Sequence, residues 1–258
     1  MITHATAQGT RDHQEDRYLV YEYAAGVMMA VFDGHGGDAA AVTCADLLPK
    51  LLDELYSGNF YRHAESPYLT EKDEGFSPHR TYLWIFHQLH EATAALRSGT
   101  TATMAFVPKD GRAAYMATLG DSPLVWCNGL GVSFGSEHNV RTNLAERERA
   151  LARGGTYEGG YIFGPHRGSM GLQMARALGD YDLDLVLSRE PDFFATNLDR
   201  DSFILVATDG VVDPSHGGGD DMQQVIDLIR QGKSAKDLVD RAIQLDTHDN
   251  ATAIIWRP

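Results

Sequence analysis

Carboxylic acids in this chain stand at the ends of short apolar runs that have the composition of β-strands. Asp33 and Asp209 each come directly after such a run and begin an Asp-Gly dipeptide, and Glu15, Asp16 and Asp249 come shortly before other runs. Two unit charges about 5 Å apart repel by about 3 kcal/mol at an effective dielectric constant of about 20, so a fold that gathers these acids needs a cation among them. Oxygen ligands without clustered His or Cys favour Mg²⁺ or Mn²⁺ over Zn²⁺. The pattern predicts a metal-dependent enzyme that acts on an anionic substrate.

Each of these acids also has an explanation that involves no chemistry. Asp-Gly is common in hairpin turns, Asp249-Asn250 suits an Asx turn, and Glu15-Asp16 suits a solvated pair on an edge strand. The stretch Asp33-Gly34-His35-Gly36-Gly37 is more specific, because glycines around a histidine let a ligand approach the backbone closely. The functional interpretation depends on all of these acids occurring together in one chain.

The composition narrows the class of protein. The chain has 258 residues, of which 43% are hydrophobic, a formal net charge of −14 and a pI near 5.1. An acidic protein lacks the basic surface that binds nucleic acids and anionic membranes, so neither is expected as a partner. No apolar run is long enough to span a membrane, and the amino terminus lacks the basic and apolar regions of a secretory signal. With only Cys44 and Cys127 the chain fits a reducing compartment, and we expect it in the cytoplasm.

Periodicity and punctuation residues indicate the elements that must position these acids. Strands are expected around residues 17–23, 27–32, 102–107, 113–119, 123–127, 203–208 and 251–256. Helices are expected to begin near Asp38, Leu83, Asn143, Asp221 and Ser234. Pro49 is expected to kink or shorten the first helix. Strands early and late in the chain, with helices in adjacent pairs, indicate an α+β fold with antiparallel sheets.

Nothing in the sequence divides the chain. There is no internal repeat and no long linker, so a single domain over residues 1–258 is expected. Residues 56–81 are polar and rich in turn formers, which indicates a surface excursion between two helices. Residues 154–172 form a second irregular, Gly-rich stretch, and a loop of that length is usually functional.

A set of motifs occurs in a fixed order over nearly the whole chain. They are Arg11-Asp12-His13-Gln14-Glu15-Asp16, Asp33-Gly34-His35-Gly36-Gly37, Ser98-Gly99-Thr100-Thr101-Ala102, Gly120-Asp121-Ser122, Ala175-Arg176-Ala177-Leu178-Gly179-Asp180, Ala207-Thr208-Asp209-Gly210 with Asp213, and Asp249-Asn250. In this order they resemble the PPM (PP2C-type) family of metal-dependent protein Ser/Thr phosphatases. The resemblance implies an αββα sandwich of two antiparallel sheets flanked by helix pairs, with a binuclear metal site at one edge.

The resemblance also implies a set of metal ligands. Asp33 would bridge two ions, and the carbonyl of Gly34 would bind one of them. Glu15 would ligate one ion, and Asp209 and Asp249 would ligate the other. The ions would be Mn²⁺ or Mg²⁺, two bound tightly and a third more weakly.

Five further residues receive roles from the same resemblance. Arg11 would hold the substrate phosphate through its planar fork, and His35 would be the general acid. Asp16 would orient metal-bound water from behind the ligands. Asp121 and Asp213 match positions that complete the weaker third metal site in some relatives.

Some positions depart from the family pattern. Pro123 stands where Arg commonly follows Gly-Asp-Ser, and Glu137-His138 replaces an Asp-His pair. Residues 140–172 would form the flap beside the cleft, and the stretch 56–81 matches no motif of the family.

The implied function is removal of phosphate from phosphoserine and phosphothreonine in proteins, by direct attack of a water or hydroxide that bridges the two metals. Its partners would be phosphorylated proteins, in a pathway opposed to one Ser/Thr kinase, and the enzyme would be a monomer. Two alternatives stay open. One is a pseudophosphatase that uses the fold for binding, whose signature would be lost ligands, and the other is a phosphohydrolase for small molecules.

Overall fold

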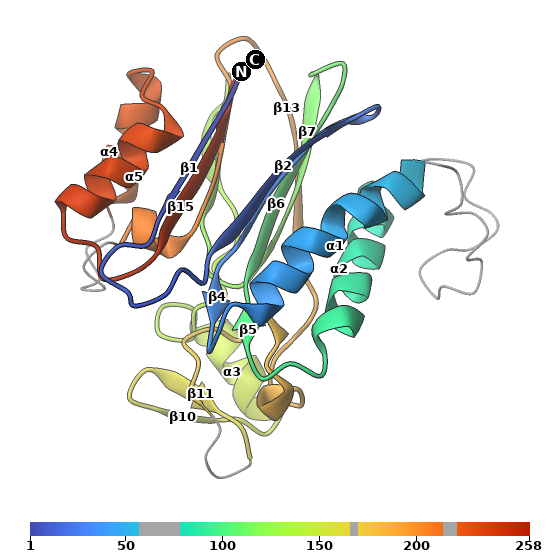
Figure 1. Ribbon diagram of the computed structural model, residues 1–258, viewed down its shortest axis with the longest axis vertical. Coiled ribbons are helices and arrows are strands. Elements are labelled where there is room, and N and C mark those ends of the chain that lie inside the picture. The colour runs from blue at the N-terminus through green and yellow to red at the C-terminus, as the bar shows by residue number, and fades with distance from the viewer. Residues whose placement is uncertain (57–77, 166–169, 214–220) are drawn as a thin grey trace.

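The computed structural model describes residues 1–56, 78–165, 170–213 and 221–258, which form a four-layered αββα sandwich (Figure 1). One antiparallel sheet has the order β1-β15-β14-β8-β9 and consists, in that order, of Ile2–Ala7, Ala251–Trp256, Phe203–Ala207, Leu124–Asn128 and Gly131–Phe134. The other has the order β13-β7-β6-β3-β2 and consists of Asp192–Asn197, Ala113–Leu119, Ala102–Pro108, Gly26–Phe32 and Arg17–Tyr23. The predicted α+β architecture is confirmed.

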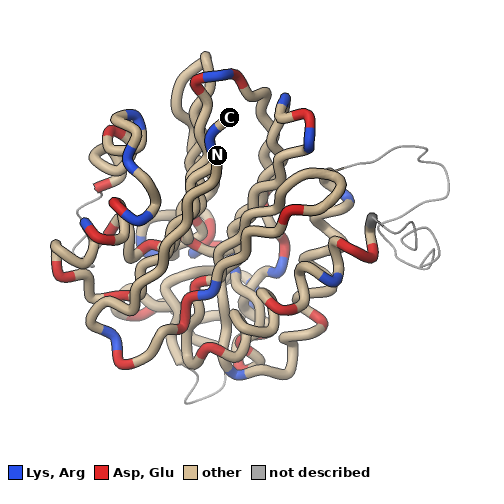
Figure 2. The backbone as a smooth tube through the Cα atoms, turned by 45° about the horizontal axis from the view of Figure 1, so that its top comes forward, with Lys and Arg blue, Asp and Glu red and all other residues tan. Residues whose placement is uncertain are grey.

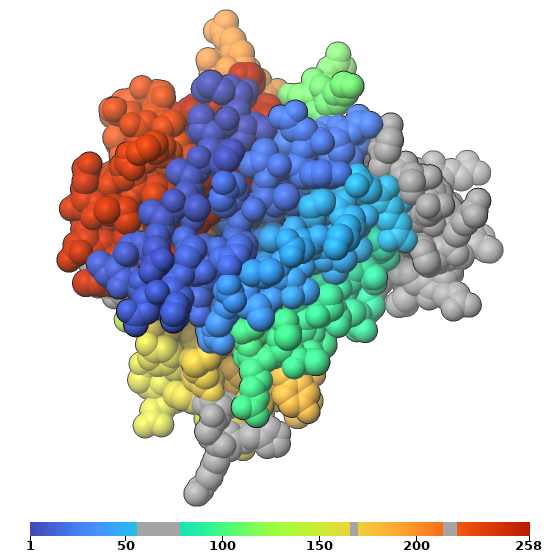
Figure 3. All heavy atoms as spheres, in the orientation of Figure 1, coloured from blue at the N-terminus to red at the C-terminus, as the bar shows by residue number. Residues whose placement is uncertain are grey.

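Helix pairs cover the two outer faces. Helices α1 (Ala39–Tyr56) and α2 (Pro78–Thr93) pack on the sheet that contains β3, and α4 (Met222–Arg230) and α5 (Ala235–Gln244) pack on the sheet that contains β15. None of the described helices has both the length and the apolar character needed to cross a membrane. Figure 3 shows the amino-terminal strands between the two helix layers, and the amino-terminal and carboxyl-terminal ends lie together in Figure 1.

The layers follow from the alternation of side chains along buried strands. In β3, Met28, Ala30 and Phe32 point toward α1 and α2, whereas Met29 and Val31 point into the core between the sheets. Successive strand residues face opposite sides of a sheet, so a strand covered on both faces must be apolar throughout. This is why β3 appears in the sequence as an uninterrupted apolar run.

The helix caps agree in part with the sequence. Ser234 and Asp237 form a complete capping box at the start of α5. Asp221 stands at the N-cap of α4, but its carboxylate pairs with Arg241 at 2.7 Å and makes no capping hydrogen bond. The predicted helix start at Asp221 is therefore confirmed, but its carboxylate pairs with a cation from α5 and does not bind the first amides of the helix.

Two predicted helix boundaries also differ. Helix α1 contains Pro49 and continues to Tyr56, so it is not shortened. Buried side chains beyond the proline, Leu51 and Leu52, pack in the core and stabilise the last turns. Helix α2 begins at Pro78, inside the stretch 56–81; residues 57–77 of that stretch lie outside the described part of the chain.

Several strands were not predicted, because tertiary pairing and not local pattern forms them. Strand β1 pairs with β15, and β13 pairs with β7, both as sheet edges with partly polar sequences. A small sheet of order β12-β5-β4 consists of Leu178–Gly179, Gly99–Thr100 and Gly34–His35. Helix α3 (Leu144–Ala152) and the hairpin of β10 (Thr156–Glu158) and β11 (Tyr161–Phe163) lie in the predicted flap, below the strand ends in Figure 1.

Candidate active site

The acids at strand ends meet at one edge of the sandwich. Asp33 follows β3 and Asp209 follows β14, while Asp249 comes just before β15, which runs antiparallel to β14. The two sheets are tied at this edge by the amide of Glu15, which donates to Oδ1 of Asn250 at 2.7 Å. Figure 2 shows acidic segments along the loops at the lower ends of the strands. The fold therefore gathers the carboxylates that the sequence singled out.

Asp16 is the least exposed of the carboxylates at this edge of the sandwich. Its side chain is 4% exposed, and Oδ2 accepts hydrogen bonds from the hydroxyls of Thr208 at 2.9 Å and Thr252 at 2.6 Å. Burial raises the pKa of Asp16 to about 7, although the two hydroxyls lower it. These contacts come from the strands of the opposite sheet, so Asp16 fastens the two sheets together beneath the acidic edge.

Asp33 lies at the centre of the electrostatic repulsion. Burial raises the pKa of Asp33 well above its ordinary value, and the charges of Asp16, Asp209, Asp249 and Asp121 raise it further. Carboxylates raise one another's pKa in this way only when they lie close together and away from bulk water, so these acids share one poorly solvated region. A cation bound there would offset the repulsion, and without one the edge is a concentration of negative charge.

The donor atoms suit hard cations. Carboxylate oxygens dominate the edge, and Oδ1 of Asp213 is buried with no hydrogen-bond partner among the described residues. The amide of Asp213 donates to the carbonyl of Asp209 at 2.8 Å, which places it one turn beyond that residue. A Cβ at Gly34 would come within 2.5 Å of the carbonyl oxygen of Glu15, so only glycine allows these two segments to approach. The residues present fit Mg²⁺ or Mn²⁺.

The carboxylates approach one another without converging on one point. In the described stretches, no three His, Cys, Asp or Glu side chains are grouped closely enough to hold an ion as they stand. Protein groups engage some of the oxygens instead: Oε1 of Glu15 accepts from the amide of Gly37 at 2.6 Å, and Oδ1 of Asp249 accepts from the amide of Asn250 at 2.8 Å.

Arg11 lies at the rim of the edge. Its Nη2 atom is 2.8 Å from Oδ2 of Asp249, and its Nε donates to the carbonyl of His248 at 2.8 Å. The side chain of Arg11 is 47% exposed, so part of the guanidinium faces solvent. The structure thus places the predicted phosphate-binding cation beside one of the predicted metal ligands.

Asp121 reaches the same region from the end of β7. Burial raises the pKa of Asp121, while a hydrogen bond from Nδ2 of Asn139 to Oδ2, at 2.9 Å, lowers it. A positive charge on His35 also lowers the pKa of Asp121. Asn139 was missed in the sequence, where an amide next to Glu137-His138 gave no signal of its own.

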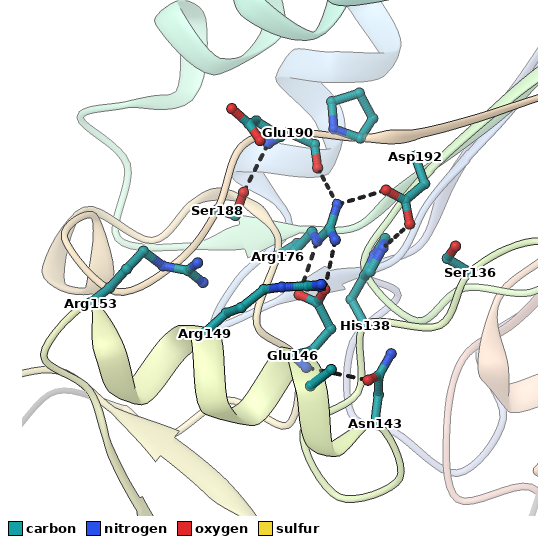
Figure 4. A pocket seen from close by; sticks show the side chains of 12 residues that line it. Ser136, His138, Asn143, Glu146, Arg149, Arg153, Arg176, Ser188, Glu190 and Asp192 are labelled. Atoms are coloured by element: carbon teal, nitrogen blue, oxygen red, sulfur yellow. Dashed lines mark hydrogen bonds and ion pairs between the residues drawn. The ribbon is translucent and has the colours of Figure 1, made fainter.

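A separate polar cavity of about 490 Å³ lies between α3 and the start of β13 (Figure 4). Arg176 crosses it, with Nη2 2.6 Å from Oε1 of Glu146 and Nη1 3.0 Å from Oδ1 of Asp192. His138 accepts from the amide of Gly120 at Nδ1, at 3.0 Å, so its Nε2 donates to Asp192 at 3.1 Å. None of the acids of the metal edge lines this cavity. The side chains that line the cavity link helix α3, through Glu146, to the amide of Gly120, which directly precedes Asp121.

Replacing the buried Glu146 by Gln is expected to lower the free energy of unfolding by about 3 kcal/mol at pH 7, because Arg176, whose side chain is 11% exposed, loses one of its two carboxylate partners. Burial tends to raise the pKa of Glu146, but the hydrogen bonds and charge of Arg176 outweigh it and hold the pKa below the ordinary 4.5. The stabilisation is thus complete above pH 4.5 and is lost as the pH falls through the lowered pKa.

Urea titrations between pH 3 and 8 measure this difference, with the exposed Glu148→Gln as a matched control. A gap between wild type and Glu146→Gln that stays constant down to pH 3 would show that the ion pair is not its source.

The fold and its acidic edge are those of a metal-dependent hydrolase for anionic substrates. The chain belongs to the protein phosphatase 2C family, whose sequence pattern it matches over residues 4–251. This is a family of metal-dependent protein Ser/Thr phosphatases, so the predicted family and enzyme class are confirmed.

Relatives and solved structures agree with this assignment. The chain is 30% identical to "Probable protein phosphatase 2C 2" of rice, over 96% of this chain and 68% of the relative, and 29% identical to "Protein phosphatase 2C homolog 3" of Schizosaccharomyces pombe, over 88% and 55%. It thus spans between about half and two thirds of these relatives. A serine-threonine phosphatase 2C from Toxoplasma gondii shares the fold at 21% identity, with a TM-score of 0.73 and coverage of 98% and 93%. So does the catalytic domain of PstP in complex with two manganese ions, at 19% identity, with a TM-score of 0.62 and coverage of 99% and 96%.

Proposed function

We propose that this chain removes phosphate from phosphoserine and phosphothreonine in proteins, at a metal site centred on Asp33. The gathering of buried, mutually repelling carboxylates at one edge is the observation that carries the proposal. Asp33 would bridge two ions, with the carbonyl of Gly34 and the carboxylate of Glu15 on one side and Asp209 and Asp249 on the other. When bound, two such ions lower the pKa of a water molecule and offset charge on the phosphoryl oxygens.

The remaining residues would act on the substrate and on the architecture of the site. Arg11 would bind two oxygens of the phosphoryl group through its exposed fork and hold it in line for attack. His35 would give a proton to the departing serine or threonine oxygen, which is a poor leaving group as an alkoxide. Asp16 would orient water at the metal site from behind the ligands, held in place by its hydrogen bonds from Thr208 and Thr252. Asp121 and Asp213 would complete a third, weaker metal site.

The choice of ion, the location and the oligomeric state are proposals of the same kind. Mn²⁺ or Mg²⁺ would serve as the ions, a choice that the complex of PstP with two manganese ions supports. We propose a cytoplasmic, monomeric enzyme that opposes a Ser/Thr kinase. Because Glu15, Asp33, Asp209 and Asp249 are all present, the signature of a pseudophosphatase is not met.

The proposal is tested by hydrolysis of a phosphoserine peptide and of small phosphate esters, with Mn²⁺, with Mg²⁺ and with excess EDTA. We expect hydrolysis of the peptide that chelation abolishes and added metal restores. Full activity in EDTA would refute the metal-dependent mechanism. Binding of the peptide without turnover would favour a pseudophosphatase, and turnover of small esters alone would favour the small-molecule alternative.

Replacing Arg11 by Ala is expected mainly to raise KM for phosphorylated substrates, because a contact made in both ground and transition states contributes uniform binding. Arg11→Lys should recover only part of the loss, since an ammonium cannot form the two parallel hydrogen bonds of a guanidinium. Steady-state kinetics with metal content measured in parallel checks this, with the exposed Arg97→Ala as control. An Arg11→Ala enzyme with unchanged kcat/KM would remove Arg11 from the site.

A further inference from the structure

His35 is held by a carboxylate to which the proposed chemistry gives no role. Its Nε2 atom lies 2.8 Å and 3.0 Å from the two oxygens of Asp180. The side chain of Asp180 is only 3% exposed and that of His35 18% exposed. An ionised carboxylate can only accept, so Nε2 carries a proton and donates it to Asp180. The other ring nitrogen, Nδ1, is buried and has no hydrogen-bond partner among the described residues.

The small sheet β12-β5-β4 is what brings these two residues together across 145 positions of the chain. His35 in β4 lies opposite Gly99 in β5, and Gly99 lies opposite Gly179 in β12. Asp180 follows Gly179 directly, and its amide donates to the carbonyl of Ser98 at 3.1 Å. The register therefore sets Asp180 beside His35 independently of their own contact.

Two features around the contact between His35 and Asp180 are unfavourable in themselves: a strained backbone at Asp180 and a position, Gly99, that admits only glycine. Asp180 has a φ of 53°, in the left-handed region that non-glycine residues seldom adopt. Gly99 has no room for a side chain, because a Cβ there would lie 2.0 Å from Oδ2 of Asp180 and 2.2 Å from Nε2 of His35. Backbone strain of this kind concentrates where the surrounding structure enforces a functional geometry.

We propose that Asp180 is a positioning residue for His35: it fixes the imidazole through Nε2 and leaves Nδ1 as the nitrogen that would give its proton to the departing oxygen of the substrate, a contact that requires the groups covering Nδ1 to move aside. In the transfer the Nδ1–H bond breaks and an O–H bond forms on the serine or threonine oxygen, while the Nε2–H bond to Asp180 persists. This inference rests on the proposed phosphatase function and adds to it the residue that orients its proton donor.

Asp180→Gly tests the proposal, because glycine removes the carboxylate and also relaxes the left-handed backbone. On a phosphoserine peptide we expect kcat to fall by roughly 10–100-fold, less than the roughly 10²–10⁴-fold that acid–base catalysis contributes, because the imidazole itself stays in place. On an aryl phosphate with an acidic phenol, which leaves largely without a proton, the loss should be clearly smaller. Asp180→Asn keeps one acceptor oxygen and tolerates the same backbone conformation, so its kcat should be intermediate on the peptide.

A double-mutant cycle shows whether Asp180 acts through His35. In an His35→Ala background, Asp180→Gly should cause no further loss on the peptide, because residues that act as one unit are non-additive. Asp182→Asn is the matched control, since its carboxylate lies two positions further along and faces Arg97 at 3.7 Å. It should have wild-type kcat on both substrates.

The outcomes separate this inference from the proposed function. Equal losses on both substrates in Asp180→Gly, or additive losses in the double mutant, would overturn the positioning role while leaving the phosphatase intact. A wild-type enzyme that hydrolyses neither substrate would instead refute the proposed function itself.

Discussion

Replacing Asp33 by Asn is expected to lower kcat by several orders of magnitude on every phosphate ester and to abolish the rise in melting temperature that Mn²⁺ produces. Burial and the charges of Asp16, Asp209, Asp249 and Asp121 all raise the pKa of Asp33, so it lies among the other carboxylates, and the proposed function gives it the role of ligand to two ions. Phosphate-monoester hydrolysis is among the slowest uncatalysed reactions and requires on the order of 20 kcal/mol of stabilisation, so loss of a bridging ligand should be severe.

Although Asp33→Asn should lose activity, it should not lose thermal stability in the absence of metal. The pKa of Asp33 in the folded protein is raised, so its ionised form opposes folding as the pH rises above the ordinary 3.8. A neutral amide removes that repulsion. The metal-free Asp33→Asn protein should therefore melt at a temperature equal to or above that of metal-free wild type.

Thermal unfolding with and without Mn²⁺, together with kcat measured at saturating Mn²⁺, tests both statements. Asp46→Asn, exposed on α1, serves as a control for the loss of one carboxylate. Retention of wild-type kcat in Asp33→Asn, or of its full stabilisation by Mn²⁺, would refute the bridging assignment.

Replacing His35 by Ala should lower kcat by roughly 10²–10⁴-fold on a phosphoserine peptide, the usual range for acid–base catalysis, and by clearly less on an activated aryl phosphate. An alkoxide needs a proton as it leaves, whereas an acidic phenol does not. Metal binding should persist, because the proposed ligands are unchanged.

Comparison of kcat for the two substrates, with wild type and mutant at saturating metal, decides the role of His35. If His35 serves only to order the turn around Gly36 and Gly37, both substrates should lose activity equally, and such a result would discard the general acid. His87→Ala, on the partly exposed face of α2, is a control for the loss of an imidazole.

The sequence by itself determined the elements whose signals are local. The apolar run of β3 and the start of α5 at Ser234 both follow from side-chain periodicity or capping chemistry within a few residues. The ordered motifs also carried the family and the acids of the site, because each acid stands next to a strand end that is itself recognisable.

Only the tertiary structure decided which distant groups meet. Asp180 ended a recognised motif but had no assigned partner until strand pairing set it against His35, and Arg176 gave no sign that it would join Glu146 to Asp192. Pro49 lies inside a continuous helix, against its local preference, because buried neighbours hold the following turns. In each case the deciding free energy comes from packing or charge pairing between segments far apart in the chain, and local pattern does not contain that information.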